Sequence, residues 1–207
     1  MHNIDTNTMF KLSYGLFVLC AKAGGKDNGC IINTVTQITQ TPLRISIAVN
    51  NQNLTHDMIK ESGLFNVSVL SQRAPFSLFQ HFGFQSGRNA DKFPVGDKTL
   101  RAANGICYQS EYANAVISAK VSQVLEFETH SVFIADITEA FALSGDASAT
   151  YQYYFDNIKP KPGAAAAKAD KKGFVCKICA YVYEGDSLPS DFICPTCKHG
   201  ADDFEAL

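Results

Sequence analysis

Four cysteines near the C-terminal end are the residues in this sequence best suited to chemistry. They form two pairs, Cys176 with Cys179 and Cys194 with Cys197, and each pair has the spacing C-x2-C. Two thiolates on each of two tight turns can converge on one tetrahedral metal ion. A segment as short as 174–207 buries too little apolar surface to fold by itself, so cross-links or a metal must hold it together.

Disulfides are the alternative to a metal. The N-terminal sequence MHNIDTNTMFKL has no basic region followed by an apolar stretch, unlike a secretion signal. Because disulfides are rare in reducing compartments, we expect a cytoplasmic protein in which Cys20, Cys30 and Cys107 are reduced. Four thiolates suit either iron or zinc, and the ligand count alone does not choose between them.

Composition and charge limit the classes of protein to consider. The 207 residues are 46% hydrophobic, enough for one full core and a small appended domain. The net charge of -2 argues against nucleic acid or an anionic membrane surface as the main partner. The longest apolar runs are far shorter than a membrane span. Neither a G-x-G-x-x-G motif nor a P-loop occurs, so a Rossmann nucleotide site is unsupported.

Two domains joined by a linker are expected. Residues 159–173, KPKPGAAAAKADKKG, combine prolines, an alanine run and lysines with almost nothing to bury, which predicts a flexible linker. A short alanine-rich helix in the second half of this segment is the alternative. The first domain is therefore assigned to 1–158, and the remainder, 174–207, is named the C-terminal module.

The elements that must position a site in the first domain are mainly strands. Apolar patterns predict strands at 16–23, 30–38, 43–49, 64–70, 113–127 and 131–143. Helices are predicted at 54–63, where Thr55 can cap the first turn and Gly63 can end the last, and at 74–83. Long strands that outnumber helices favour a mainly β fold, an antiparallel barrel with short helices packed on its outside.

An unusually polar strand carries the first family resemblance. Amide and hydroxyl side chains crowd the segment NGCIINTVTQITQTP at 28–42. This segment resembles the flavin-binding strand of the flavin reductase-like, FMN-binding split-barrel family, in which a G-x-T-x-S-S-x-x-S-x-S pattern precedes a proline. The residues that match are Gly29, Asn33, Thr34, Gln37, Thr39 and Pro42. The resemblance implies an FMN site that includes Asn33, Thr34, Thr36 and Gln37.

The family pattern continues through the predicted helix at 54–63. The segment IAVNNQNLTHDMIKESGLFNVSVL at 47–70 is similar to the family's strand, Asn/Thr-rich turn, helix and strand, which implies that Asn50 also contacts the flavin. A helix N-terminus has free N–H groups and the positive end of the dipole, which suit a phosphate. We therefore expect Thr55 and His56 to bind the flavin phosphate, and a helix cap is the alternative role for Thr55.

Three further residues are candidates for the flavin site. The loop HFGFQSGRNADKF at 81–93 could bring the Arg88 guanidinium to a phosphate, with a solvated loop as the alternative. His130 lies in LEFETHSVFIADI at 125–137, which is similar to the family's G-D-H-x-x-F-x-G-x-V strand. That resemblance implies a catalytic position near flavin and nicotinamide, whereas a lone histidine on a strand is more often a core residue. Cys30 is expected to be a small buried side chain, although it could approach the flavin ring.

The C-terminal module resembles rubredoxin. The resemblance rests on the V-C-x-x-C-x-Y-x-Y opening, the C-P-x-C closing pair and the D-F-E ending. It implies an iron held by the four cysteines and an aromatic core of Tyr181, Phe192 and Phe204, with a zinc ribbon as the alternative. Six acidic residues against two lysines suit docking on a more basic redox partner.

The two resemblances together predict a redox relay, and the domain order is similar to that of the high-molecular-weight rubredoxins of anaerobes. A flavin accepts two electrons as hydride and releases them singly, whereas an iron held by four thiolates changes by one electron. The resemblance implies that NAD(P)H reduces FMN, that FMN reduces the iron, and that the iron serves a partner such as a flavodiiron oxygen or nitric oxide reductase. It also implies a homodimer with flavin at the subunit interface. The alternatives are a flavin or ferric reductase, and an FMN-binding protein with a structural zinc ribbon.

Overall fold

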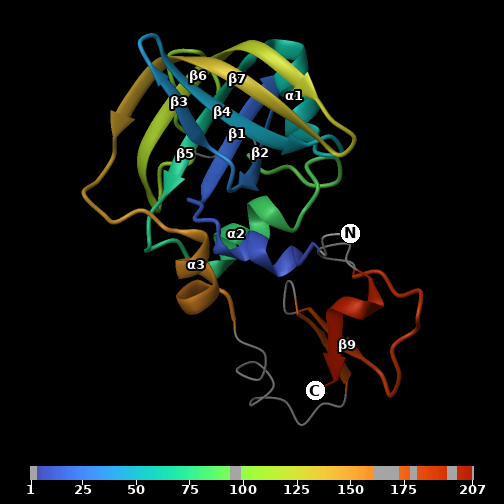
Figure 1. Ribbon diagram of the computed structural model, residues 1–207. Helices are drawn as coiled ribbons and strands as arrows, with labels where there is room; N and C mark the ends of the chain where they lie inside the picture. Colours follow the sequence, from blue (N-terminus) through green and yellow to red (C-terminus); the bar gives the residue numbers. More distant parts are fainter. Residues whose placement is uncertain (1–3, 94–98, 161–172, 178–180, 195–199, 207) are drawn as a thin grey trace.

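A curved antiparallel sheet forms the first domain in a computed structural model of the chain (Figure 1). The structure describes residues 4–206 except for 94–98, 161–172, 178–180 and 195–199, so most of the expected linker lies outside the described residues. The strand order is β2-β1-β5-β6-β7-β4-β3. The strands are β1 (Phe17–Ala23), β2 (Lys26–Ile32), β3 (Thr36–Gln40), β4 (Leu43–Asn50), β5 (Leu64–Leu70), β6 (Ala113–Glu126) and β7 (His130–Ala142).

The predicted strand at 30–38 is wrong, because this segment belongs to two strands. β2 begins earlier, at Lys26, and returns along β1 through a turn at Gly24 and Gly25, whose φ angles of 54° and 80° lie in the left-handed region. β3 begins at Thr36 and pairs with β4. The polar segment between them passes from one edge of the sheet to the other, and the remaining predicted strands match observed ones within about one residue.

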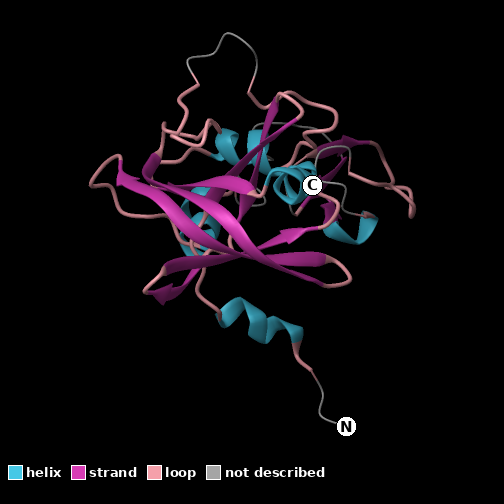
Figure 2. Cartoon of the chain, turned by 90° about the horizontal axis from the view of Figure 1, so that it is seen from above, coloured by secondary structure: helices cyan, strands magenta, loops and turns pink. Residues whose placement is uncertain are grey.

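Short helices flank the sheet, which confirms the mainly β prediction. They are η1 (Thr6–Lys11), α1 (Leu54–Ser62), α2 (Phe76–Gly83), α3 (Tyr151–Tyr153) and η2 (Tyr154–Ile158). α1 ends at Gly63 as predicted, but its N-cap is Asn53, whose Oδ1 accepts a hydrogen bond from Thr55 N at 3.1 Å. None of the helices in the described ranges is long and apolar enough to cross a membrane. The view in Figure 2 shows η1 projecting away from the sheet.

Two apolar clusters hold the first domain together, one on each side of β1. Phe17, Leu19 and Ala21 point into the interior cluster that the curved sheet encloses. The alternate residues Val18 and Cys20 join a second cluster with α2. This alternation follows from the two-residue period of a strand, and burial on both faces explains why the β1 sequence is continuously apolar. α1 packs over β1 and β2, so its N-terminus is fixed next to the end of β4.

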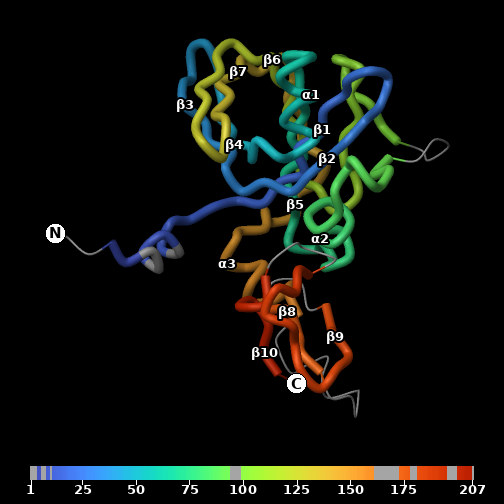
Figure 3. The backbone as a smooth tube through the Cα atoms, turned by 90° about the vertical axis from the view of Figure 1, so that its right-hand side faces the viewer, coloured from blue at the N-terminus to red at the C-terminus, as the bar shows by residue number. Residues whose placement is uncertain are grey.

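The described part of the C-terminal module is a small three-stranded sheet. Its order is β10-β8-β9, formed by β10 (Phe204–Ala206), β8 (Gly173–Cys176) and β9 (Val182–Glu184), with the short helix η4 (Ala201–Asp203) before β10. Phe192 packs edge-on against Phe204, with ring centroids 5.4 Å apart, and stacks with Tyr181. The predicted aromatic core is therefore confirmed. Figures 1 and 3 both show the module at the end of the barrel where α2 and α3 lie.

Candidate functional site

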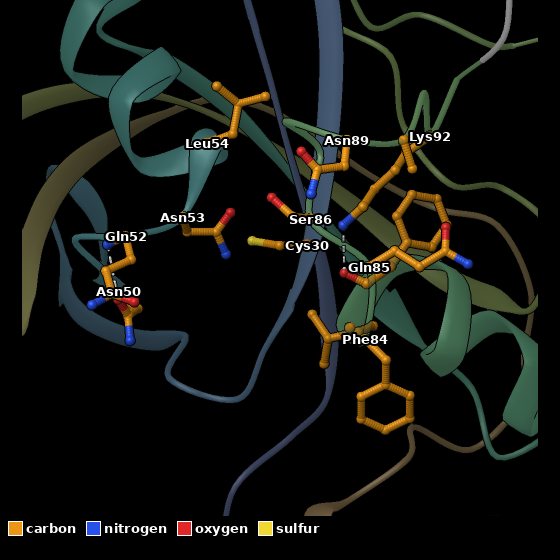
Figure 4. Close-up of a pocket in the computed structure, with 14 residues that line it drawn as sticks. Cys30, Asn50, Gln52, Asn53, Leu54, Phe84, Gln85, Ser86, Asn89 and Lys92 are labelled. Atoms are coloured by element: carbon orange, nitrogen blue, oxygen red, sulfur yellow. Dashed lines mark hydrogen bonds between the residues drawn. The ribbon is translucent and has the colours of Figure 1, made fainter. Parts of the chain in front are cut away.

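A cavity of about 540 Å³ opens between the N-terminus of α1 and the loop that follows α2 (Figure 4). This volume lies within the usual range for small-molecule sites. Its polar wall is rich in side-chain amides, which present hydrogen-bond donors and acceptors side by side, as the edge of a heteroaromatic ring requires. The polar lining residues are Asn50, Gln52, Asn53, Gln85, Ser86, Asn89 and Lys92, and the apolar ones include Ile31, Leu54, Phe82 and Phe84.

Lys92 places a buried positive charge at this cavity. Its side chain is 4% exposed, and its ammonium donates hydrogen bonds to Gly29 O at 2.9 Å and Phe82 O at 2.8 Å. Burial lowers the pKa of Lys92. The ammonium makes no ion pair with a carboxylate among the described residues. Because a buried cation is stabilised by a counter-charge, this arrangement favours an anionic ligand.

The loop that carries Lys92 is held tightly against β2. At Gly87 a side-chain Cβ would lie 2.0 Å from Asn28 Oδ1, so a larger residue cannot occupy this position without a shift of the loop or of the Asn28 side chain. Asn28 is fully buried, and its Nδ2 donates to Thr55 Oγ1 at 2.9 Å. Lys26 Nζ adds a hydrogen bond to Gly87 O at 2.8 Å. The loop is thus anchored at its middle, next to the α1 N-terminus.

Thr55 and His56 lie inside the protein, and neither lines the cavity. Thr55 is fully buried and accepts the hydrogen bond from Asn28 described above. His56 Nε2 lies 2.9 Å from Ser131 Oγ, and its Nδ1 lies 3.0 Å from Asp57 Oδ1. These contacts tie α1 to β2 and β7. The residues beside them in sequence, Asn53 and Leu54, are the ones that reach the cavity.

Arg88 is paired within the protein. Its Nη2 donates to Asp57 Oδ2 at 2.6 Å, and the hydrogen bond from His56 together with this one from Arg88 lowers the pKa of Asp57. The pair joins the loop to α1 across the rim of the cavity. Of the two cations that flank Asn89 in this loop, Lys92 lies at the cavity wall and Arg88 lies outside it.

The predicted flavin-strand residues lie on the connection from β2 to β3 and on β3 itself, outside the cavity lining. Asn33 and Thr34 are half-buried, and Thr34 Oγ1 donates to Ala48 O at 2.7 Å and accepts from Ala48 N at 3.2 Å, which fixes the connection to β4. Thr36 and Gln37 are exposed on the edge strand β3. Their role at a flavin stays a prediction.

Asn50 and His130 are brought together by the pairing of β4 with β7. They are directly opposite in the register, and Asn50 lines the cavity. His130 is exposed, with Nδ1 2.9 Å from Thr129 Oγ1, so it is not a core histidine. His130 is therefore an exposed neighbour of a cavity residue, and its predicted role beside the flavin stays a prediction.

Cys30 faces the cavity although it is only 3% exposed (Figure 4). Burial raises the pKa of its thiol, while the hydrogen bond from Thr55 and the charge of Lys92 oppose that shift. The thiol is therefore uncharged at neutral pH and forms an apolar part of the cavity floor.

In the C-terminal module, Cys176 and Cys194 are buried together with Phe204. Cys176 N donates to Tyr181 O at 2.8 Å, which ties the first cysteine to the start of the segment that carries β9. Cys179 and Cys197 lie outside the described residues. The metal-ligand role of all four cysteines therefore stays a prediction, and the two that the structure describes lie in one cluster.

Sequence reasoning missed Gln52, Asn53, Asn89 and Lys92 as cavity residues. The loop at 81–93 is a predicted candidate, but the sequence could not show that Lys92 lines the cavity while Arg88 pairs with Asp57, because burial and pairing depend on the fold. An amide-rich turn, NNQN at 50–53, was the available signal for Gln52 and Asn53.

Comparison with known proteins agrees with this architecture. Residues 9–161 match the family described as "Flavin reductase like domain", and residues 174–205 match "Rubrerythrin, rubredoxin-like domain". The chain is 36% identical to a high molecular weight rubredoxin of Moorella thermoacetica, covering 99% of this chain and 100% of that protein. It is 34% identical to a ferric-chelate reductase (NAD(P)H) of Archaeoglobus fulgidus, over 73% of this chain and 89% of that protein.

The fold is similar to that of a crystal structure of an FMN-binding protein from Thermus thermophilus. It superimposes with a TM-score of 0.61 at 17% identity, covering 70% of this chain and 79% of that one. The two family matches together cover nearly the whole chain. The first spans the curved sheet and the cavity, and the second spans the cysteine cluster. The chain belongs to the flavin reductase-like family and carries a rubredoxin-like domain at its C-terminal end, in the same architecture as the high-molecular-weight rubredoxins.

Proposed function

We propose that this chain is an NAD(P)H-dependent electron-transfer protein in which electrons pass from nicotinamide through FMN to a four-cysteine iron centre and on to a redox partner. The observation that carries the proposal is the cavity at the α1 N-terminus, in which Lys92 supplies a buried positive charge beside an amide-rich wall. FMN has an anionic phosphate and a ring edge of alternating donors and acceptors, so the residues present fit it.

The residues have separate tasks in this proposal. Lys92 balances the negative charge of the ligand, and Asn50, Asn53 and Asn89 hydrogen-bond and orient it. His130, exposed beside Asn50, helps to seat the nicotinamide. Bound FMN supplies the ability to accept a hydride and release single electrons.

The C-terminal module supplies the one-electron step. Iron bound by the four thiolates would change by one electron at a time. The acidic surface of the module favours a basic partner, and a flavodiiron-type oxygen or nitric oxide reductase is the partner that we propose. In this proposal the linker predicted at 159–173 lets the module reach this partner.

The test is an anaerobic visible spectrum of the purified protein, with metal analysis, before and after one equivalent of NADH and then of NADPH. The proposal expects flavin and ferric-thiolate absorbance to bleach together. In Cys179→Ser, flavin should still bleach while reduction of the downstream acceptor is lost. If the native module holds zinc under conditions in which iron is supplied, or if flavin bleaches and iron does not, the relay is refuted.

We also propose a homodimer. β6 is exposed on both faces beyond Val121, and Val124, Leu125 and Phe127 expose large apolar surface there. A strand with both faces bare is expected to be covered by another chain. Sedimentation velocity should therefore show a dimer, and Leu125→Asp should shift it towards monomer. A monomeric native chain at micromolar concentration would contradict this proposal.

A ferric reductase is the second candidate, favoured by the similarity to the Archaeoglobus ferric-chelate reductase. In that case the first domain alone would reduce a ferric chelate at the full rate. Loss of the module's iron in Cys179→Ser would then leave ferric reduction unchanged, whereas the relay proposal expects the acceptor reaction to disappear.

A further inference from the structure

Phe84 connects the cavity to the cysteine cluster of the C-terminal module. Its side chain packs against the cluster formed by Cys176, Cys194 and Phe204. Phe84 lies in the loop after α2, far from these residues in sequence, so the contact is made by folding. Two of the four predicted metal ligands therefore lie in a cluster that reaches the first domain of the same chain.

The same residue belongs to the wall of the cavity. Phe84 is one of the lining residues, and Figure 4 shows its ring directed away from Cys30 and Lys92. The ring lies against Phe76, the first residue of α2, with centroids 5.9 Å apart. α2 thus holds a side chain that lines the cavity and also packs against the module.

We propose that Phe84 is the docking point at which the C-terminal module seats on the first domain of its own chain, at the mouth of the flavin cavity. This inference rests on the proposed function and adds where the internal transfer takes place. In the docked state, one electron leaves the reduced flavin and converts the ferric centre to ferrous. A one-electron-accepting redox protein reoxidises the centre before the second electron follows, so each reduced flavin serves two such cycles.

A contact centred on one aromatic side chain is sufficient because the module is tethered. A linker of the predicted length gives an effective concentration on the order of millimolar, so even weak docking is well populated. Aromatic anchors in small interfaces carry a large share of the binding energy. A small contact also lets the module leave and expose its acidic surface to a partner.

The first test measures docking without electron transfer. In the full-length chain loaded with zinc, which is diamagnetic, backbone ¹⁵N relaxation gives separate rotational correlation times for the module and for the barrel. The two should be equal in the native chain. Phe84→Ala should reduce the correlation time of the module at least twofold, and Phe84→Leu should reduce it less.

Phe141→Ala is the matched control. Phe141 is also a half-buried phenylalanine beside another aromatic ring, Tyr108, but it lies at the end of β7, outside the cavity and outside the module contact. It should leave both correlation times unchanged. The proposal is overturned if the native module already tumbles independently, or if Phe84→Ala leaves the module tumbling with the barrel.

The second test follows the iron-loaded chain after rapid anaerobic reduction of the flavin. Bleaching of the ferric-thiolate band should be independent of protein concentration in the native chain and about tenfold slower in Phe84→Ala, relative to flavin reduction in the same trace. A rate proportional to protein concentration would mean transfer between molecules and would overturn docking within one chain. If the native iron is never reduced but the tumbling result holds, the proposed function fails while the docking contact remains.

Discussion

Replacing Lys92 with methionine should weaken FMN binding about ten- to a hundredfold and leave riboflavin binding almost unchanged. An ammonium has three N–H groups, and two of them are used by Gly29 O and Phe82 O. The third is available to a ligand in the cavity, and one hydrogen bond to a charged group contributes about 1.5–3 kcal/mol. Since about 1.4 kcal/mol is a factor of ten in Kd, the loss is about ten- to a hundredfold.

The assay is a titration of the flavin-free protein with FMN and with riboflavin, followed by the quenching of flavin fluorescence. Riboflavin lacks the phosphate, so it separates the charge of the phosphate from contacts with the ring. Lys26→Met is the matched control. Like Lys92, Lys26 donates a hydrogen bond to a backbone carbonyl, in its case Gly87 O in the loop after α2, but Lys26 does not line the cavity. We expect its FMN affinity to equal that of the native chain.

Two outcomes would refute the reasoning about Lys92. If FMN and riboflavin lose affinity equally, the ammonium acts at the ring instead of the phosphate. If neither loses affinity, the buried charge does not serve the ligand at all. A thermal unfolding curve of the flavin-free variant is needed beside these data, because the variant also removes the two hydrogen bonds from the ammonium to Gly29 O and Phe82 O, at about 1–3 kcal/mol each.

Three further predictions concern the loop, the ion pair and the module. Gly87→Ala should lower the unfolding free energy by about 1–3 kcal/mol in denaturant titrations, because the new Cβ meets the buried, hydrogen-bonded Asn28 side chain; an unchanged midpoint would contradict this. His56 and Arg88 hold the pKa of Asp57 below its usual value, so its contribution to stability is present above about pH 4 and is lost as the pH falls through the lower folded pKa. The stability difference between native chain and Asp57→Asn should therefore shrink towards pH 2, and a difference that grows there would show the opposite sign. Chelating the metal anaerobically should unfold the module alone, so that limited proteolysis leaves a fragment of the first domain's size; survival of the module without metal would show that apolar burial suffices.

Much of the fold was predictable because apolar periodicity reflects local geometry. β5 matches its predicted range, and Gly63 ends α1 as predicted. The error at 30–38 has a physical cause, since a run of apolar residues does not reveal where a strand leaves one sheet edge and joins the other. The N-cap of α1 was predicted at Thr55 and is Asn53. Threonine and asparagine both cap helices, and only the fold shows that the Thr55 hydroxyl is buried and accepts a hydrogen bond from Asn28.

The sequence by itself determined the two-family architecture, the mainly β fold and the cysteine quartet, because ligand spacing and strand patterns are local properties of the chain. Only the tertiary structure decided that Lys92 is the cation at the cavity and that Arg88 forms an ion pair with Asp57. It also decided that Phe84 joins the cavity to the cysteine cluster. The physical reason is that burial and charge pairing depend on which segments meet in space. The sequence around two cations in one loop does not show which of them will be buried and which will form an ion pair.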